Sequence, residues 1–144
     1  MTSPIQSMVI PRPMHVVIVD DDPEVVTGLR RVLHSAEPEW LISTANNGKE
    51  ALSLMSGEKV DVVITDLHMP EMDGFQLLGQ LERAHPETIR IVHSSHTATL
   101  ATQLMRYLAH NVLTKPTPAR DIVAMARWAV HAAGAVRRYE ACEA

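Results

Sequence analysis

Apolar residues follow two alternating spacings along most of this chain. Short runs rich in β-branched residues, typical of strands covered on both faces, lie at 15–19, 60–65 and 88–93. Between these runs, apolar residues recur three and four positions apart, as they do on one face of a helix. The pattern predicts strands that alternate with helices.

Capping and turn residues place the boundaries of these elements. Asp22 followed by Pro23, and Asn47 before a short periodic segment, are typical of helix starts. The sequence predicts strands at 15–19, 40–45, 60–65, 88–93 and 112–114. It predicts helices from 23, at 48–56, over about ten residues up to 84, at about 97–109 and from about 118 onward.

This order of elements predicts an α/β fold. Five strands alternating with five helices favour a doubly wound five-stranded parallel sheet with helices on both faces. Residues 1–13 contain three prolines and are expected to form a flexible arm, so the domain should span 14–132. Residues 133–144 extend the last helix beyond what packing needs, and this extension is a linker, a dimer seam or a tail.

Composition narrows the class of protein. With 144 residues, 46% hydrophobic and 21% charged, the chain suits one soluble globular domain, and its few aromatic residues require an aliphatic core. The net charge of −4 with scattered lysines and arginines argues against direct binding to nucleic acid. No apolar run is long enough to span a membrane, and Cys142 has no partner for a disulfide. We expect a cytoplasmic protein.

Polar residues stand where the predicted strands end. Asp20 and Asp21 follow the first strand, Asp66 follows the third, Ser94 ends the fourth and Lys115 follows the fifth. In a doubly wound sheet, ligands bind beyond the carboxyl ends of the strands, so these residues should meet at one edge.

The residue types at this edge suggest phosphoryl transfer. Three carboxylates repel one another unless a cation neutralises them, and Mg²⁺ prefers such oxygen ligands. Asp20, Asp21 and Asp66 are therefore the expected metal ligands. Asp66 could also accept a phosphoryl group on its carboxylate, with Lys115 neutralising the phosphoryl oxygens and the Ser94 hydroxyl donating to one of them.

Four segments carry a resemblance to a known family. VIVDDDPEV (17–25), VVITDLHMPEMDG (62–74), IRIVHSS (89–95) and LTKP (113–116) resemble the signatures of response-regulator receiver domains of two-component signalling, and the match covers roughly residues 14–130. The resemblance implies the flavodoxin-like strand order 2-1-3-4-5. It also implies a sensor histidine kinase or phosphotransfer protein as the donor, and an output domain or downstream protein as the recipient of the signal.

The resemblance also assigns roles to individual residues. It makes Asp66 the phosphoacceptor, Asp20 and Asp21 the acidic pair, and Ser94 the switch hydroxyl, with Lys115 contacting the phosphate. It implies that the backbone carbonyl of His68 is a further metal ligand and that the Lys115–Pro116 bond is cis. Such a protein catalyses its own aspartyl phosphorylation and dephosphorylation but is not a turnover enzyme.

Some positions depart from the common pattern. Ser95 replaces the usual alanine or glycine after the switch residue, and Val112 stands where an aromatic residue is common, which argues against a switch through an aromatic rotamer. Signalling through a loop shift or a homodimer is the expectation instead. The sequence around HSSHT and LTKP resembles receivers attached to HD-GYP or HDOD output domains more than receivers attached to DNA-binding domains.

Two histidines flank the expected phosphoryl site. His68 and His96 stand two positions beyond the acceptor and the switch residue. They are either exposed loop residues or groups that control the water attacking phospho-Asp66, with a pH dependence near histidine's usual pKa of about 6.5.

Three other functions compete with the receiver hypothesis. A degenerate receiver would bind proteins without phosphorylation, although all five site residues are present. A phosphohydrolase could use Asp20 and Asp22, but Pro23 fits that arrangement poorly. A flavodoxin-like FMN carrier needs a hydroxyl- and glycine-rich phosphate loop where this chain has three acids.

Overall fold

The computed structural model describes residues 12–95 and 107–143. Its strands are β1 (His15–Val19), β2 (Leu41–Ala45), β3 (Val62–Thr65), β4 (Ile89–Ser94) and β5 (Asn111–Thr114). Its helices are α2 (Pro23–Ala36), α3 (Gly48–Gly57), α4 (Gly74–Ala84) and α6 (Ala119–Glu143).

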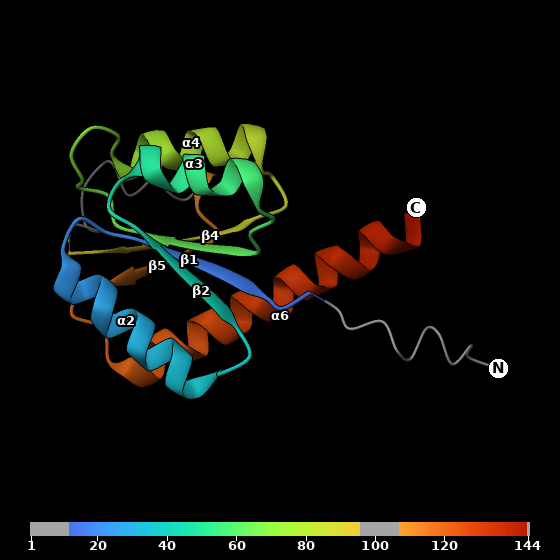
Figure 1. Cartoon of the computed structure of the whole chain (residues 1–144), viewed down its shortest axis with the longest axis horizontal. Helices are drawn as coiled ribbons and strands as arrows, with labels where there is room; N and C mark the ends of the chain where they lie inside the picture. Colours follow the sequence, from blue (N-terminus) through green and yellow to red (C-terminus); the bar gives the residue numbers. More distant parts are fainter. Residues whose placement is uncertain (1–11, 96–106, 144) are drawn as a thin grey trace.

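The described strands form one parallel five-stranded sheet in the order β2-β1-β3-β4-β5. Helices α3 and α4 cover one face, and α2 and α6 cover the other, as Figure 1 shows. The predicted fold class and strand order are therefore confirmed.

Side chains of β1 alternate between two apolar layers. Val16 and Ile18 pack with α2 and α6, whereas Val17 and Val19 pack with α3 and α4, because successive side chains of a strand point to opposite faces. All four are at most 1% exposed. Among the described residues, the buried apolar side chains are those of Val, Ile, Leu, Met and Ala, as the scarcity of aromatic residues predicted.

Side-chain caps begin three of the helices. The side chain of Asp22 accepts a hydrogen bond from the Glu24 N–H, with Pro23 in the first turn, and the Asn47 side chain accepts one from the Glu50 N–H. Asp73 begins α4 in a reciprocal capping box. Both predicted caps are confirmed.

The predicted boundaries differ from the observed ones at several points. Strand ends shift by up to two residues. The helix predicted over about ten residues up to 84 begins at Gly74, because Asp73 caps it. The helix expected at about 97–109 lies largely outside the described residues.

Helix α6 continues well past residue 132 and remains in contact with the domain. Ala133 of α6 is 2% exposed and belongs to the apolar layer between the sheet and the helices α2 and α6. The division of the chain at 132 stays a prediction, and the helix crosses that position without interruption. Within 12–95 and 107–143, no helix combines the length and the apolar character needed to cross a membrane.

An ion-pair cluster fastens the far part of α6 to the sheet. The buried carboxylate of Asp61 accepts two hydrogen bonds from Arg12, both 3.0 Å long, and two from Arg137, of 2.9 and 2.6 Å. It also accepts one of 2.8 Å from the backbone N–H of His15. This Asp61 cluster joins the segment before β1, the residue before β3 and the C-terminal part of α6.

Candidate functional site

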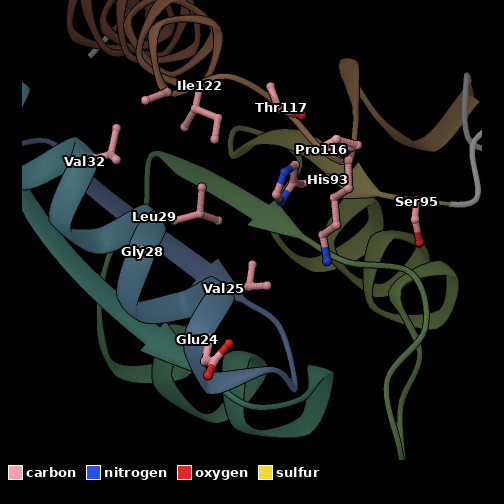
Figure 2. A pocket seen from close by; sticks show the side chains of 12 residues that line it. Glu24, Val25, Gly28, Leu29, Val32, His93, Ser95, Pro116, Thr117 and Ile122 are labelled. Atoms are coloured by element: carbon pink, nitrogen blue, oxygen red, sulfur yellow. The ribbon is translucent and has the colours of Figure 1, made fainter.

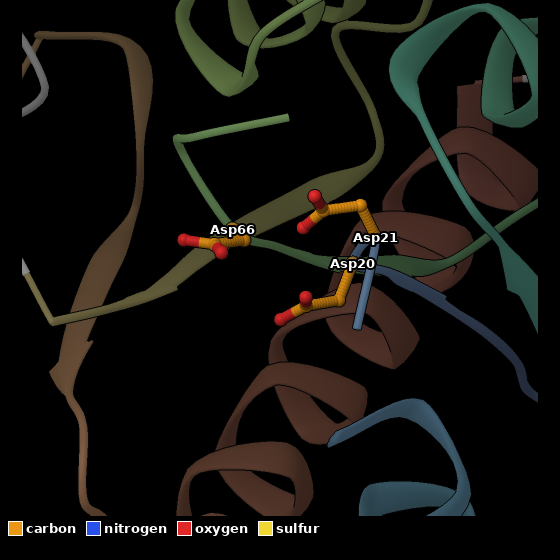
Figure 3. Close-up of side chains that lie close together, drawn as sticks. All are labelled: Asp20, Asp21 and Asp66. Carbon is orange, nitrogen blue, oxygen red and sulfur yellow. The ribbon is translucent and has the colours of Figure 1, made fainter. Parts of the chain in front are cut away.

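The three predicted carboxylates meet at the carboxyl edge of the sheet. Oxygen atoms of Asp20, Asp21 and Asp66, one from each, all lie within 4.8 Å of one another. Figure 3 shows the three side chains converging, with Asp20 and Asp21 from the end of β1 and Asp66 from the end of β3. The prediction that the strand ends bring these residues together is confirmed.

Asp20 is the buried member of the group, at 2% exposure. Its Oδ1 accepts a hydrogen bond of 2.9 Å from the backbone N–H of Asp22, which fixes the carboxylate at the turn into α2. Burial raises the pKa of Asp20, although Lys115 and the Asp22 N–H act in the opposite direction. This carboxylate is therefore a group that gains from a nearby cation.

Asp66 is held by the backbone around it. Its N–H donates to the carbonyl oxygen of Val19 at 2.9 Å, and its Oδ1 accepts from the N–H of Leu67 at 2.7 Å. The N–H of Gly74 donates to the carbonyl oxygen of Leu67 at 2.9 Å, so the start of α4 lies directly against this turn. The carboxylate consequently has a defined direction toward the edge of the sheet.

Lys115 connects two of the carboxylates. Its Nζ lies 2.8 Å from Asp20 Oδ2 and 3.3 Å from Asp66 Oδ2. Burial alone would lower the pKa of Lys115, but the hydrogen bond that it donates to Asp20 and the charges of both carboxylates raise it, so the ammonium form is favoured. The bond between Lys115 and Pro116 is cis, as expected.

Ser94 and His68 occupy different environments. Ser94 is fully buried at the end of β4, and its carbonyl oxygen accepts a hydrogen bond of 2.9 Å from the N–H of Lys115. His68 is exposed in the loop between β3 and α4, one residue beyond the buried Leu67. His96 lies outside the described residues.

The ligand types at the site fit a hard divalent cation. The convergent atoms of Asp20, Asp21 and Asp66 are all carboxylate oxygens, and Asp21 is exposed, so one side of the group faces solvent. Mg²⁺ takes few carboxylate ligands and keeps waters or phosphate oxygens at its other positions. The residues present suit such an ion.

Sequence reasoning missed the environment of His93. This side chain is 6% exposed on β4, next to Ser94, and its Nδ1 has no hydrogen-bond partner among the described residues. Burial, followed by the positive charge of Lys115, lowers the pKa of His93 to about 4, while Asp66 opposes the shift. The available signal was a histidine within a strand expected to be covered on both faces.

Comparison with known proteins identifies the family. Residues 16–127 match the model of the response regulator receiver domain. The chain therefore belongs to this family, and it is a receiver domain of the kind found in two-component response regulators.

Individual relatives agree with this assignment. The chain is 37% identical over 109 residues to the transcriptional regulatory protein GlrR of Escherichia coli, a match that covers 73% of this chain and 23% of that protein. It is 36% identical over 120 residues to a protein-glutamate methylesterase/protein-glutamine glutaminase of Desulfitobacterium hafniense, covering 80% and 30%. The chain thus spans about a quarter to a third of the length of these relatives.

A solved structure shows the same fold. The signal receiver domain of an HD domain-containing protein from Pseudomonas fluorescens superimposes with a TM-score of 0.83 at 23% identity, covering 90% of this chain and 96% of that one. At this identity the likeness concerns the fold alone, and the attachment to an HD-GYP or HDOD output domain stays a prediction.

Proposed function

We propose that Asp66 accepts a phosphoryl group from the phosphohistidine of a sensor histidine kinase or phosphotransfer protein. The observation that carries this proposal is the convergence of Asp66 with Asp20, Asp21 and Lys115 at the carboxyl edge of the sheet. In a signalling domain, this arrangement supplies both a nucleophile and the charges that phosphoryl transfer requires.

In the proposed reaction, a carboxylate oxygen of Asp66 attacks phosphorus as the phosphorus–nitrogen bond of the donor breaks. The donor imidazole leaves with the electron pair of that bond and takes up a proton, and Asp66 becomes an acyl phosphate. Lys115, already 3.3 Å from Asp66 Oδ2, can turn its ammonium toward a phosphoryl oxygen. A bound Mg²⁺ would supply further charge neutralisation, held by Asp20, Asp21, Asp66 and the backbone carbonyl of His68.

Two further residues complete the proposed site. The Ser94 hydroxyl would donate to a phosphoryl oxygen. The hydrogen bond of 2.9 Å from the N–H of Lys115 to the carbonyl oxygen of Ser94 supports this role as the switch residue, because it keeps Ser94 next to Lys115. The exposed side chain of His68 would limit access of the attacking water to phospho-Asp66. The protein would in this way catalyse its own phosphorylation and dephosphorylation.

The remaining proposals concern the setting of the domain. We propose that the signal passes to an output domain or a downstream protein, with a homodimer as one route, because longer relatives carry additional regions beyond the matched part. We also propose a cytoplasmic location, where histidine kinases form their phosphohistidine.

Intact-protein mass spectrometry after incubation with acetyl phosphate and Mg²⁺ tests the proposal. We expect one phosphoryl group on the natural chain and none on Asp66→Asn. Asp121→Asn, which changes an exposed carboxylate of α6, is the matched control and should behave as the natural chain.

Two outcomes would contradict the proposal. Equal phosphorylation of Asp66→Asn would place the acceptor elsewhere. The absence of any phosphorylation would support the degenerate, phosphorylation-independent receiver, which the relatives do not favour.

A further inference from the structure

A cavity of about 540 Å³, broadly open to solvent, lies between α2 and the turn that leads into α6 (Figure 2). Its walls are mainly apolar side chains, namely those of Val25, Leu29, Val32, Pro116 and Ile122. This volume is within the range of small-molecule sites in proteins. The cavity is separate from the acidic group, although Lys115 contributes to both.

The imidazole of His93 is one of the polar groups of the cavity wall, together with Glu24, Ser95, Lys115 and Thr117. Figure 2 shows this ring directed into the space between α2 and the β5–α6 turn. The side chain is 94% buried, and Nδ1 has no hydrogen-bond partner among the described residues. A buried polar atom without a partner costs free energy, so a ligand hydroxyl toward which the ring turned this nitrogen would gain affinity from the new bond.

The protonation state of His93 restricts the chemistry of that ligand. Burial and the neighbouring Lys115 lower its pKa to about 4, so the ring is neutral near pH 7. A neutral imidazole has one donor and one acceptor nitrogen. A hydroxyl group both donates and accepts, and it can therefore pair with either tautomer.

The charges at the cavity disfavour an anionic ligand. The ammonium group of Lys115 is already engaged by Asp20 and Asp66. Glu24 also lines the cavity and would repel a negative charge. A neutral molecule with an apolar body meets neither difficulty.

We propose that this cavity binds a small neutral molecule with an apolar body and one hydroxyl group, which hydrogen-bonds to the imidazole of His93. The apolar body lies against Val25, Leu29 and Ile122. Because Lys115 and Pro116 line the same cavity, the ligand contacts the residue that pairs with Asp66, and this consequence rests on the proposed function.

The test uses 4-propylphenol as the probe and 4-propylanisole, which lacks the hydroxyl hydrogen, as its matched analogue. Long-range ¹H–¹⁵N spectra of the full unphosphorylated chain without Mg²⁺ follow the imidazole nitrogens of His93 during titration. We expect a saturable shift with 4-propylphenol and at least fivefold weaker binding of 4-propylanisole. Since no phosphoryl donor is present, failure here is distinct from failure of the proposed function.

Two pairs of variants locate the binding. A Cβ on Gly28 of α2 meets no atom within 4 Å, so Gly28→Leu can fill the cavity without disturbing the helix. It should abolish binding of both compounds, whereas Gly79→Leu, at an equally open glycine of α4, should leave binding unchanged. His93→Phe should remove the preference for the phenol, and His131→Phe, at an exposed histidine of α6, should retain it.

Three results would overturn the proposal. These are the absence of a saturable shift of His93, undiminished binding to Gly28→Leu, and equal affinities of the two compounds for the natural chain. Gly28→Leu keeps the test decisive even if His93→Phe does not fold.

Discussion

The pKa values of Asp20 and Lys115 are set by opposing local effects. Burial raises the pKa of Asp20 and, by itself, would lower that of Lys115. The contact of 2.8 Å between their charged groups outweighs the effect of burial on the pKa of Lys115, which is raised. It does not outweigh the effect of burial on the pKa of Asp20, which is also raised. The site therefore holds a fixed positive charge beside a carboxylate that is costly to ionise, and a divalent cation would relieve that cost.

Gly74 is the residue on whose size the Asp66 turn depends. A Cβ at Gly74 would overlap the carbonyl oxygen of Asp66 and lie 2.7 Å from the Cα of Leu67, so a backbone shift would be unavoidable. We expect Gly74→Ala to lower the free energy of unfolding by about 1–3 kcal/mol in urea titrations.

Gly79 of the same helix provides the control for this prediction. A Cβ there meets no atom within 4 Å, and alanine is a better helix former than glycine by about 1 kcal/mol. Gly79→Ala should therefore be neutral or stabilising. Equal effects of the two substitutions would show that the contact with Asp66 does not set the requirement for glycine.

At the scale of elements, α6 depends on the Asp61 cluster for the position of its far end. Arg137 lies four residues beyond the buried Ala133 and forms two hydrogen bonds with Asp61. Burial raises the pKa of Asp61, but the hydrogen bonds from Arg12 and Arg137 outweigh it and leave the pKa lowered. The Asp61 carboxylate is thus charged in the folded protein, and its charge stabilises the folded state.

Replacing Arg137 tests this attachment. Arg137→Met should lower the free energy of unfolding by about 1–3 kcal/mol at pH 7, because hydrogen bonds to a buried charge are lost. Arg127→Met is the control on the same helix, where the pair with Glu37 is exposed, and it should cost at most about 1 kcal/mol.

The effect of Arg137→Met should also depend on pH. Because the pKa of Asp61 is lowered from its usual 3.8, the stabilisation is present above that value and is lost as the pH falls through the lowered one. The difference between the two chains in urea titrations should therefore shrink below about pH 4. A difference that stays constant with pH would contradict a role for the charge.

At the scale of the whole molecule, the two polar clusters lie at opposite edges of one sheet. The acidic group with Lys115 is at the carboxyl edge, and the Asp61 cluster is at the amino edge, where the segment before β1 meets α6. Helix α6 starts near the first and reaches the second (Figure 1). This helix therefore connects the proposed phosphorylation site to the extension at 133–144.

Ending the chain at Ala132 tests whether the extension belongs to the folded domain. The truncation removes Ala133 and Arg137, so we expect a lower free energy of unfolding whose size does not depend on protein concentration. Sedimentation of both chains is the accompanying measurement. A loss of stability that depends on concentration, together with a change from dimer to monomer, would identify the extension as a dimer seam instead.

Much of the site could be predicted from the sequence because parallel strands end at a common edge. A short β-branched run precedes each of the site residues Asp20, Asp21, Asp66 and Lys115. Because strands alternate with helices along the chain, the strands are parallel and these residues lie at the same edge of the sheet. The helix caps Asp22 and Asn47 could also be predicted from the sequence, since capping is a local interaction between neighbouring residues.

The Asp61 cluster and the cavity beside His93 could not be predicted in this way. Arg12, Asp61 and Arg137 are separated by 49 and 76 positions, and no periodic pattern links them. The buried state of His93 depends on how α2 and α6 pack over β4.

The sequence by itself determined the order of the elements, the strand ends that carry the carboxylates, and the caps that begin the helices. These features follow from hydrogen bonding and apolar periodicity among residues near one another in the chain. Only the tertiary structure decided which charges pair across the sheet, which polar atom stays without a partner, and where a cavity remains. Those depend on how side chains from distant segments pack together, because burial and distance set the energy of each contact.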